Sequence, residues 1–136
     1  MARRSDQRRA AAFALYQADV TERPLEVTLE RDASLFTRAL AYAAEDRQEE
    51  LDALIARHAR GWSLDRIAPL EKAIMRTALI EIVHPDAVPG DTPIPPEGAI
   101  EEAVKTAKTY AAPQAASFVN GILAAVLRET RQNQPQ

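Results

Sequence analysis

The side chains best suited to chemistry in this sequence are the arginines near its beginning. The first nine residues carry a net charge of +3, from four arginines and one aspartate: Arg3, Arg4, Arg8, Arg9 and Asp6. Cations in the first turns of a helix oppose the helix dipole at a cost of a few tenths of a kcal/mol each. A helix N-terminus also presents free N–H groups to phosphate. The cluster therefore indicates a site for an anion.

Aromatic side chains follow these arginines at helical spacing. Arg9 shares one face of a helical wheel with Phe13 and Tyr16. Proteins that bind single-stranded RNA pair guanidinium groups for phosphate with rings for bases. The pattern thus suits RNA binding. The alternative is a solvated N-terminus whose arginines only confer solubility, with Phe13 and Tyr16 in the core.

A second unusual segment, 117–121 (SFVNG), lies inside an otherwise apolar helical pattern. Glycine inside a helix costs about 1 kcal/mol relative to alanine. Asn120 competes with the helix backbone for hydrogen bonds. We expect Gly121 to mark either a close approach of another helix, in which case a larger side chain would overpack the site, or contact with a ligand.

The sequence contains few residue patterns that could support catalysis or metal binding. The chain has no cysteine, and its two histidines, His58 and His84, form no metal-binding motif. The adjacent carboxylates Glu101 and Glu102 point about 100° apart on a helix, which does not suit paired acid–base work. These acids and Glu81 are expected on a solvated or protein-binding face. We predict no catalytic residue, no metal and no cofactor.

The composition indicates one all-helical domain over residues 1–136. Hydrophobic residues make up 46% of the chain but aromatic residues only 5%, and alanine and leucine are strong helix formers. The net charge is −3, so residues 10–136 sum to −6 and form an acidic body behind a basic arm. No apolar run approaches the length of a membrane span or a signal peptide, which predicts a cytoplasmic protein without a membrane segment.

Periodicity and helix-ending residues place the elements. Ser34 is a candidate N-cap, and Pro69 suits a first helical position. The acidic run 45–50 is either a turn that splits a long helix or an exposed part of it. Five of the nine prolines fall in 84–96, which must be a loop. Helices are expected over 4–18, 25–31, 34–59, 69–83, 97–110 and 113–130, with a flexible tail over 131–136.

Five blocks of the sequence, in order, resemble the NusB family of bacterial transcription antitermination factors. They are 8–17 (RRAAAFALYQ), 62–67 (WSLDRI), 71–81 (EKAIMRTALIE), 99–108 (AIEEAVKTAK) and 118–123 (FVNGIL). The resemblance implies an all-α bundle of about seven helices in two small subdomains, without enzymatic activity. The Pro-rich loop 84–96 is longer than is usual in the family.

The resemblance also implies partners. NusB-like proteins pair with the ribosomal protein NusE, bind the single-stranded boxA element of nascent ribosomal RNA, and join NusA and NusG on RNA polymerase. Some members self-associate, so a homodimer is an open alternative. Rival interpretations are a helical scaffold without RNA and the RNA-binding module of an rRNA methyltransferase lineage. The residues expected to bind RNA are Arg4, Arg8, Arg9, Tyr16, Phe118 and Asn120, and those expected to face the protein partner are Glu81 and Glu102.

Overall fold

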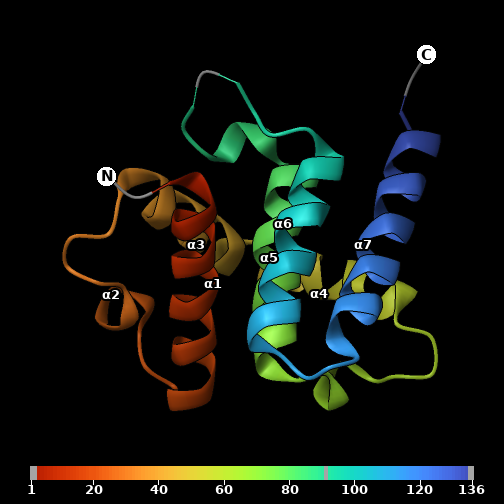
Figure 1. The fold of residues 1–136 in the computed structure, drawn as a ribbon, viewed down its shortest axis with the longest axis horizontal. Coiled ribbons are helices and arrows are strands. Elements are labelled where there is room, and N and C mark those ends of the chain that lie inside the picture. The colour runs from red at the N-terminus through yellow and green to blue at the C-terminus, as the bar shows by residue number, and fades with distance from the viewer. Residues whose placement is uncertain (1–2, 91, 135–136) are drawn as a thin grey trace.

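The computed structural model describes residues 3–90 and 92–134, and within these ranges the chain is helical with no strand. The expected all-α fold is confirmed, with seven α-helices in the described part of the chain (Figure 1). They are α1 (Arg4–Thr21), α2 (Leu25–Thr28), α3 (Leu35–Asp46), α4 (Gln48–His58), α5 (Pro69–Val83), α6 (Pro96–Tyr110) and α7 (Ala115–Gln132).

Helix α5 is the centre of the molecule. It begins at Pro69, as the sequence predicts, and every residue from Ala73 to Ile82 is buried. Helices α1 and α3 pack on one side of it, and α4, α6 and α7 pack on the other (Figure 1). A helix that is apolar around most of its circumference can be stable only in such a position. The core therefore runs through both halves of the bundle.

The acidic run 45–50 splits the long helix expected over 34–59. Helix α3 ends at Asp46, and α4 begins at Gln48 after the single residue Arg47. Ser34 caps α3 as expected, because its Oγ accepts a hydrogen bond of 3.0 Å from the backbone N–H of Thr37. The break lets two short apolar stripes face different neighbours: α3 packs on α1 and α4 packs on α7.

The Pro-rich segment after α5 is a loop with one short 3₁₀ turn, Pro85–Ala87, which packs beside α3. Figure 1 shows this loop on the same side of the molecule as the beginning of α1. Helix α1 extends to Thr21 and α7 to Gln132, each slightly beyond the expected bounds. Among the described residues, no helix combines the length and hydrophobicity that crossing a membrane requires.

Candidate nucleic-acid interface

Two arginines of the first two turns of α1 lie over one ring of α3. The guanidinium carbon of Arg4 is 4.2 Å from the centroid of Phe36, and that of Arg8 is 5.3 Å away. Phe36 is only 5% exposed, so the ring has a fixed position in the core. A cation over an aromatic face is attracted by the ring quadrupole. Phe36 thus holds two neighbouring positive charges that would otherwise repel each other.

Arg8 is also the partner of Glu81, which lies near the end of α5. The Nε and Nη2 atoms of Arg8 donate hydrogen bonds of 2.6 and 3.0 Å to the two carboxylate oxygens of Glu81. The side chains are 15% and 5% exposed. The sequence assigned Arg8 to RNA and Glu81 to a protein partner, but the structure pairs them with each other. A partner that reached the Glu81 carboxylate would have to displace Arg8.

Arg9 belongs to a second cation–aromatic cluster, on the other side of α1. Its guanidinium lies 5.6 Å from the ring centroid of Tyr110, and Tyr110 packs edge to face on Phe13 at 5.1 Å. The Nη2 atom of Arg9 also donates a 2.6 Å hydrogen bond to Asp6. This hydrogen bond lowers the pKa of Asp6 below its ordinary value. Tyr16, further along α1, is half-buried against the core.

Glu102, the other residue expected to face a protein, is half-buried on α6. Its Oε1 atom accepts a 2.9 Å hydrogen bond from the hydroxyl of Ser5 on α1. Glu81 and Glu102 therefore both accept hydrogen bonds from the first turns of α1. The neighbouring Glu101 is exposed.

The segment 117–121 lies at the beginning of α7, beside an exposed tryptophan. Trp62 is 54% exposed, and its ring centroid lies 6.1 Å from that of Phe118 in an edge-to-face arrangement. Each side of Trp62 borders a hollow, one also lined by Arg60 and Arg128 and the other by Arg66. This is a second surface that combines a ring with cations.

Gly121 forms part of the hollow beside Arg60 and Arg128, and it is exposed. The expectation of a close helix approach there is wrong, because a Cβ atom at this position would meet nothing within 4 Å. Packing therefore does not explain a glycine inside α7. Contact with a ligand, the other alternative, stays a prediction.

Asn120 lies on a different side of α7 from Phe118. It is exposed and lines a groove between α6 and α7 that also includes Glu101 and Arg128. The structure therefore does not place Asn120 and Phe118 in one hollow. In Figure 1 the beginning of α1 lies near the top of the view and the beginning of α7 near the bottom. Arg9 nevertheless contacts Tyr110, which is only five residues before α7.

Three aromatic rings that contact arginines or border the hollows described above were not among the residues expected to bind RNA. They are Phe36, Trp62 and Tyr110. Their cationic or aromatic neighbours lie far away along the chain, so local spacing gives no signal for Phe36 and Tyr110. The place of Trp62 in a short connector between helices was the one signal that the sequence offered for it. Within the described residues, no three histidine, aspartate or glutamate side chains gather as metal ligands would.

Comparison with known proteins identifies relatives of this chain. The family model described as "NusB family" matches residues 5–128. The transcription antitermination protein NusB of Symbiobacterium thermophilum is 43% identical over 100 residues, which cover 74% of this chain and 61% of that protein. The protein of the same name from Halalkalibacterium halodurans is 36% identical over 119 residues, covering 83% of this chain and 84% of that protein.

Solved structures agree with the fold. T. maritima NusB superimposes with a TM-score of 0.81 at 28% identity, covering 94% of this chain and 92% of that one. A structure of antitermination factors NusB and NusE in complex with dsRNA has a TM-score of 0.77 at 24% identity, covering 93% of this chain and 96% of the matched chain. The family match spans nearly all seven helices, so the chain is a member of the NusB family.

Proposed function

We propose that this chain is a transcription antitermination adaptor of rRNA operons, which pairs with the ribosomal protein NusE and binds single-stranded boxA-type RNA. In this role it acts in the cytoplasm, on RNA polymerase with NusA and NusG, and catalyses no reaction. Family membership supports the general role, because the relatives are named transcription antitermination proteins. The observation that carries RNA binding is the arrangement of Arg4 and Arg9 over the rings of Phe36 and Tyr110.

The geometry divides the arginines by role. Arg4 is exposed and Arg9 half-buried at the surface of α1, so both can reach phosphate. Arg8 directs two of its donors to the buried carboxylate of Glu81, whereas Arg9 makes a single hydrogen bond to the partly exposed Asp6. We therefore assign Arg4 and Arg9 to RNA contact. Arg8, with Glu81 and Glu102, positions α1.

The test is RNA binding as a function of salt. Replacing Arg4 and Arg9 by alanine should weaken binding to a boxA-containing single strand. It should also reduce the log–log salt slope by about 0.7 for each phosphate group that the variant no longer neutralises. The matched control replaces Arg23 and Arg31, two exposed arginines beyond the end of α1, and should leave the slope unchanged. An equal slope in both double variants would contradict the assignment.

The protein partner is expected to supply positive charge, which the acidic body lacks. Residues 10–136 carry a net charge of −6, which repels RNA within a Debye length of about 8 Å. A basic partner on this body would reverse the local field and add contacts. In a structural relative, NusB and NusE have been seen together with dsRNA.

We expect NusE to raise the RNA affinity of this chain at least about tenfold, which corresponds to about 1.4 kcal/mol of coupling. By linkage, RNA must then strengthen NusE binding by the same factor. Titrating RNA into the chain with and without NusE measures this coupling. A homodimeric scaffold, the alternative, predicts no RNA binding in either titration. Equal RNA affinity in the two titrations would contradict cooperative binding.

A further inference from the structure

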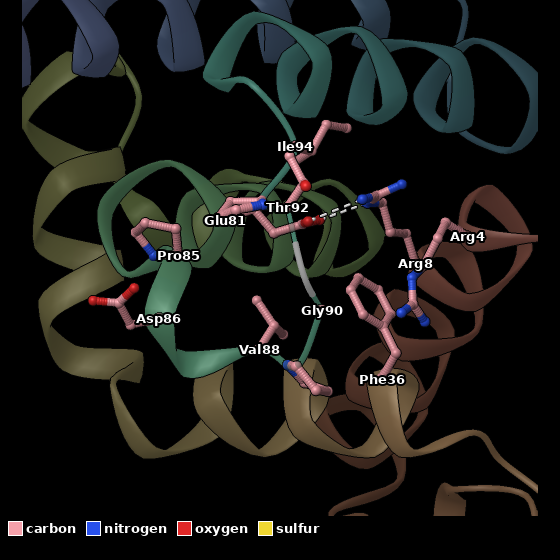
Figure 2. A pocket seen from close by; sticks show the side chains of 12 residues that line it. Arg4, Arg8, Phe36, Glu81, Pro85, Asp86, Val88, Gly90, Thr92 and Ile94 are labelled. Atoms are coloured by element: carbon pink, nitrogen blue, oxygen red, sulfur yellow. Dashed lines mark hydrogen bonds and ion pairs between the residues drawn. The ribbon is translucent and has the colours of Figure 1, made fainter.

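The hollow between Trp62 and α7 brings together two arginines, Arg60 and Arg128. Both are exposed, Arg60 just after the end of α4 and Arg128 on α7. Neither forms an ion pair or a side-chain hydrogen bond with any described residue. Arg8 differs from them, because it directs two donors at the carboxylate of Glu81 (Figure 2). The two unpaired guanidinium groups are therefore free to bind an anion.

The shape of this hollow suits a phosphate group with its sugar and base. Its volume is about 460 Å³, within the range for small-molecule sites, about 300–1,000 Å³. The guanidinium group presents several N–H donors in a geometry that matches phosphate. Ser117, which also lines the hollow, adds a hydroxyl donor. Trp62 offers a half-exposed ring for the base, and Gly121 brings no side chain into the space.

His58 adds to the hollow a group whose charge depends on pH. It is the last residue of α4, and its side chain is 19% exposed. Its Nε2 atom lies 3.0 Å from Oε2 of Glu129 on α7. Its Nδ1 atom has no hydrogen-bond partner within residues 3–90 and 92–134. A neutral ring that donates through Nε2 can only accept at Nδ1, whereas a protonated ring donates at both nitrogens.

The charges around His58 leave the hollow positive. The Glu129 carboxylate pairs with Arg57 as well as with His58. Helix α5 and the 3₁₀ turn Leu64–Arg66 also pack on α4, but in the described part of the chain neither contributes a residue to this hollow. Arg60 and Arg128 are thus the cations beside His58, and a protonated imidazole would be the third.

From this geometry we propose that the hollow binds a phosphate group of single-stranded RNA between Arg60 and Arg128, and that His58 joins them as pH falls. This inference rests on the proposed RNA-binding function, to which it adds a phosphate site and a dependence on pH. Imidazole changes its charge between about pH 5 and 8. A bound phosphate favours the protonated ring, and by linkage the proton favours phosphate binding. RNA affinity should therefore rise as pH falls.

The chain contains a matched control for His58. His84, the other histidine, also lies near a carboxylate, 2.7 Å from that of Glu50, but it does not line the hollow. Fluorescence anisotropy would measure binding of a boxA-containing single strand to the parent, His58→Gln and His84→Gln at about pH 6 and about pH 8. Glutamine retains an N–H donor but carries no charge. Thermal melts at both pH values would establish that each variant is folded.

We expect the parent to bind RNA at least about fivefold more tightly at the lower pH, which is what a hydrogen bond from a charged group adds over a neutral one. His84→Gln should keep this ratio, and His58→Gln should lose most of it. The double variant Arg60→Gln/Arg128→Gln should bind more weakly at both pH values. It should also lose the ratio, because no phosphate would then be held near His58.

Three outcomes would overturn the proposal. They are equal affinity of the parent at the two pH values, the same ratio in both histidine variants, and parent-like affinity in the double arginine variant. Each of them leaves RNA binding itself intact. If the parent bound RNA at neither pH, the proposed RNA-binding function would fail, and this site with it.

Discussion

Arg8 of α1 and Glu81 of α5 form a two-fold hydrogen-bonded ion pair across 73 residues of sequence, with Nε–Oε1 and Nη2–Oε2 distances of 2.6 and 3.0 Å. This bidentate geometry is the strongest that an arginine and a carboxylate can form. Because both side chains are largely buried, the pair is a structural link between the N-terminal helix and the centre of the bundle.

Breaking this pair from one side should be costly. Arg8→Met leaves the Glu81 carboxylate buried without its partner, and we expect a loss of about 3 kcal/mol in the free energy of unfolding. The double variant Arg8→Met/Glu81→Met removes both charges and should recover most of that loss. Urea denaturation of the parent, both single variants and the double variant gives the coupling energy. Additive losses would show that the two groups do not interact.

Gly121→Ala should stabilise the protein. The position lies inside α7, where alanine favours the helix by about 1 kcal/mol, and the added Cβ meets no neighbour within 4 Å. The melting temperature should rise by about 3 °C. The same substitution narrows the hollow beside Trp62, so RNA affinity measured in parallel shows whether the glycine makes room for a ligand. A lower melting temperature would restore the packing explanation.

Trp62→Ala should weaken RNA binding more than it affects the fold. The ring is half exposed and meets Phe118 in an edge-to-face contact, whereas stacking one base on it would contribute about 1–3 kcal/mol. The salt slope should not change, because no charge is removed. Leu35→Ala is the control, since Leu35 is 75% exposed and lies at the start of α3. If Trp62→Ala bound RNA as tightly as the parent does, Trp62 would have no role in RNA binding and would only cover Phe118.

Glu71→Gln should stabilise the protein at neutral pH. Burial raises the pKa of Glu71 above its ordinary value of 4.5, so the folded protein favours the protonated carboxyl more than the unfolded chain does. The associated stability is fully present below pH 4.5 and is lost as pH rises through the higher folded pKa. Thermal melts of the variant and the parent should therefore differ at about pH 7, with the variant higher, and converge near about pH 4.

Glu97→Gln tests a carboxylate whose pKa is shifted in the opposite direction to that of Glu71. The hydrogen bond from Arg131 lowers the pKa of Glu97, so its contribution is present above pH 4.5 and is lost as pH falls. Glu97→Gln should therefore show no gain at neutral pH. A gain of equal size in both variants would mean that the effect comes from net charge and not from the burial of Glu71.

The sequence was most informative where local rules decide the structure. The bounds of α5, its start at Pro69 and the Ser34 cap follow from periodicity and helix-end chemistry, and all are observed. The split at Arg47 was only one of two alternatives, because a polar run is compatible with both an exposed helix and a turn. Which helix lies beside which depends on packing, which the periodicity does not specify.

The candidate site also depends on contacts between distant segments, which the sequence pattern does not specify. The sequence indicated arginines and rings on α1, but the ring over which Arg4 and Arg8 lie is Phe36 of α3. Arg8 and Glu81 were assigned to different partners because nothing local shows that they meet. Gly121 was an unusual residue for its helix, and only the surrounding space excluded a packing role.

The central position of α5 also has a consequence for the timing of folding during synthesis. Helix α1 can pack on α2 and α3 soon after these are made, but it cannot pack on α5 or pair Arg8 until Glu81 has been made, 73 residues later. At synthesis rates of about 5–20 residues per second, this delay is about 4–15 s. During that interval the arginine-rich segment lacks the central helix that holds it, so the nascent chain is most exposed to proteases and to polyanions before the centre of its own bundle exists.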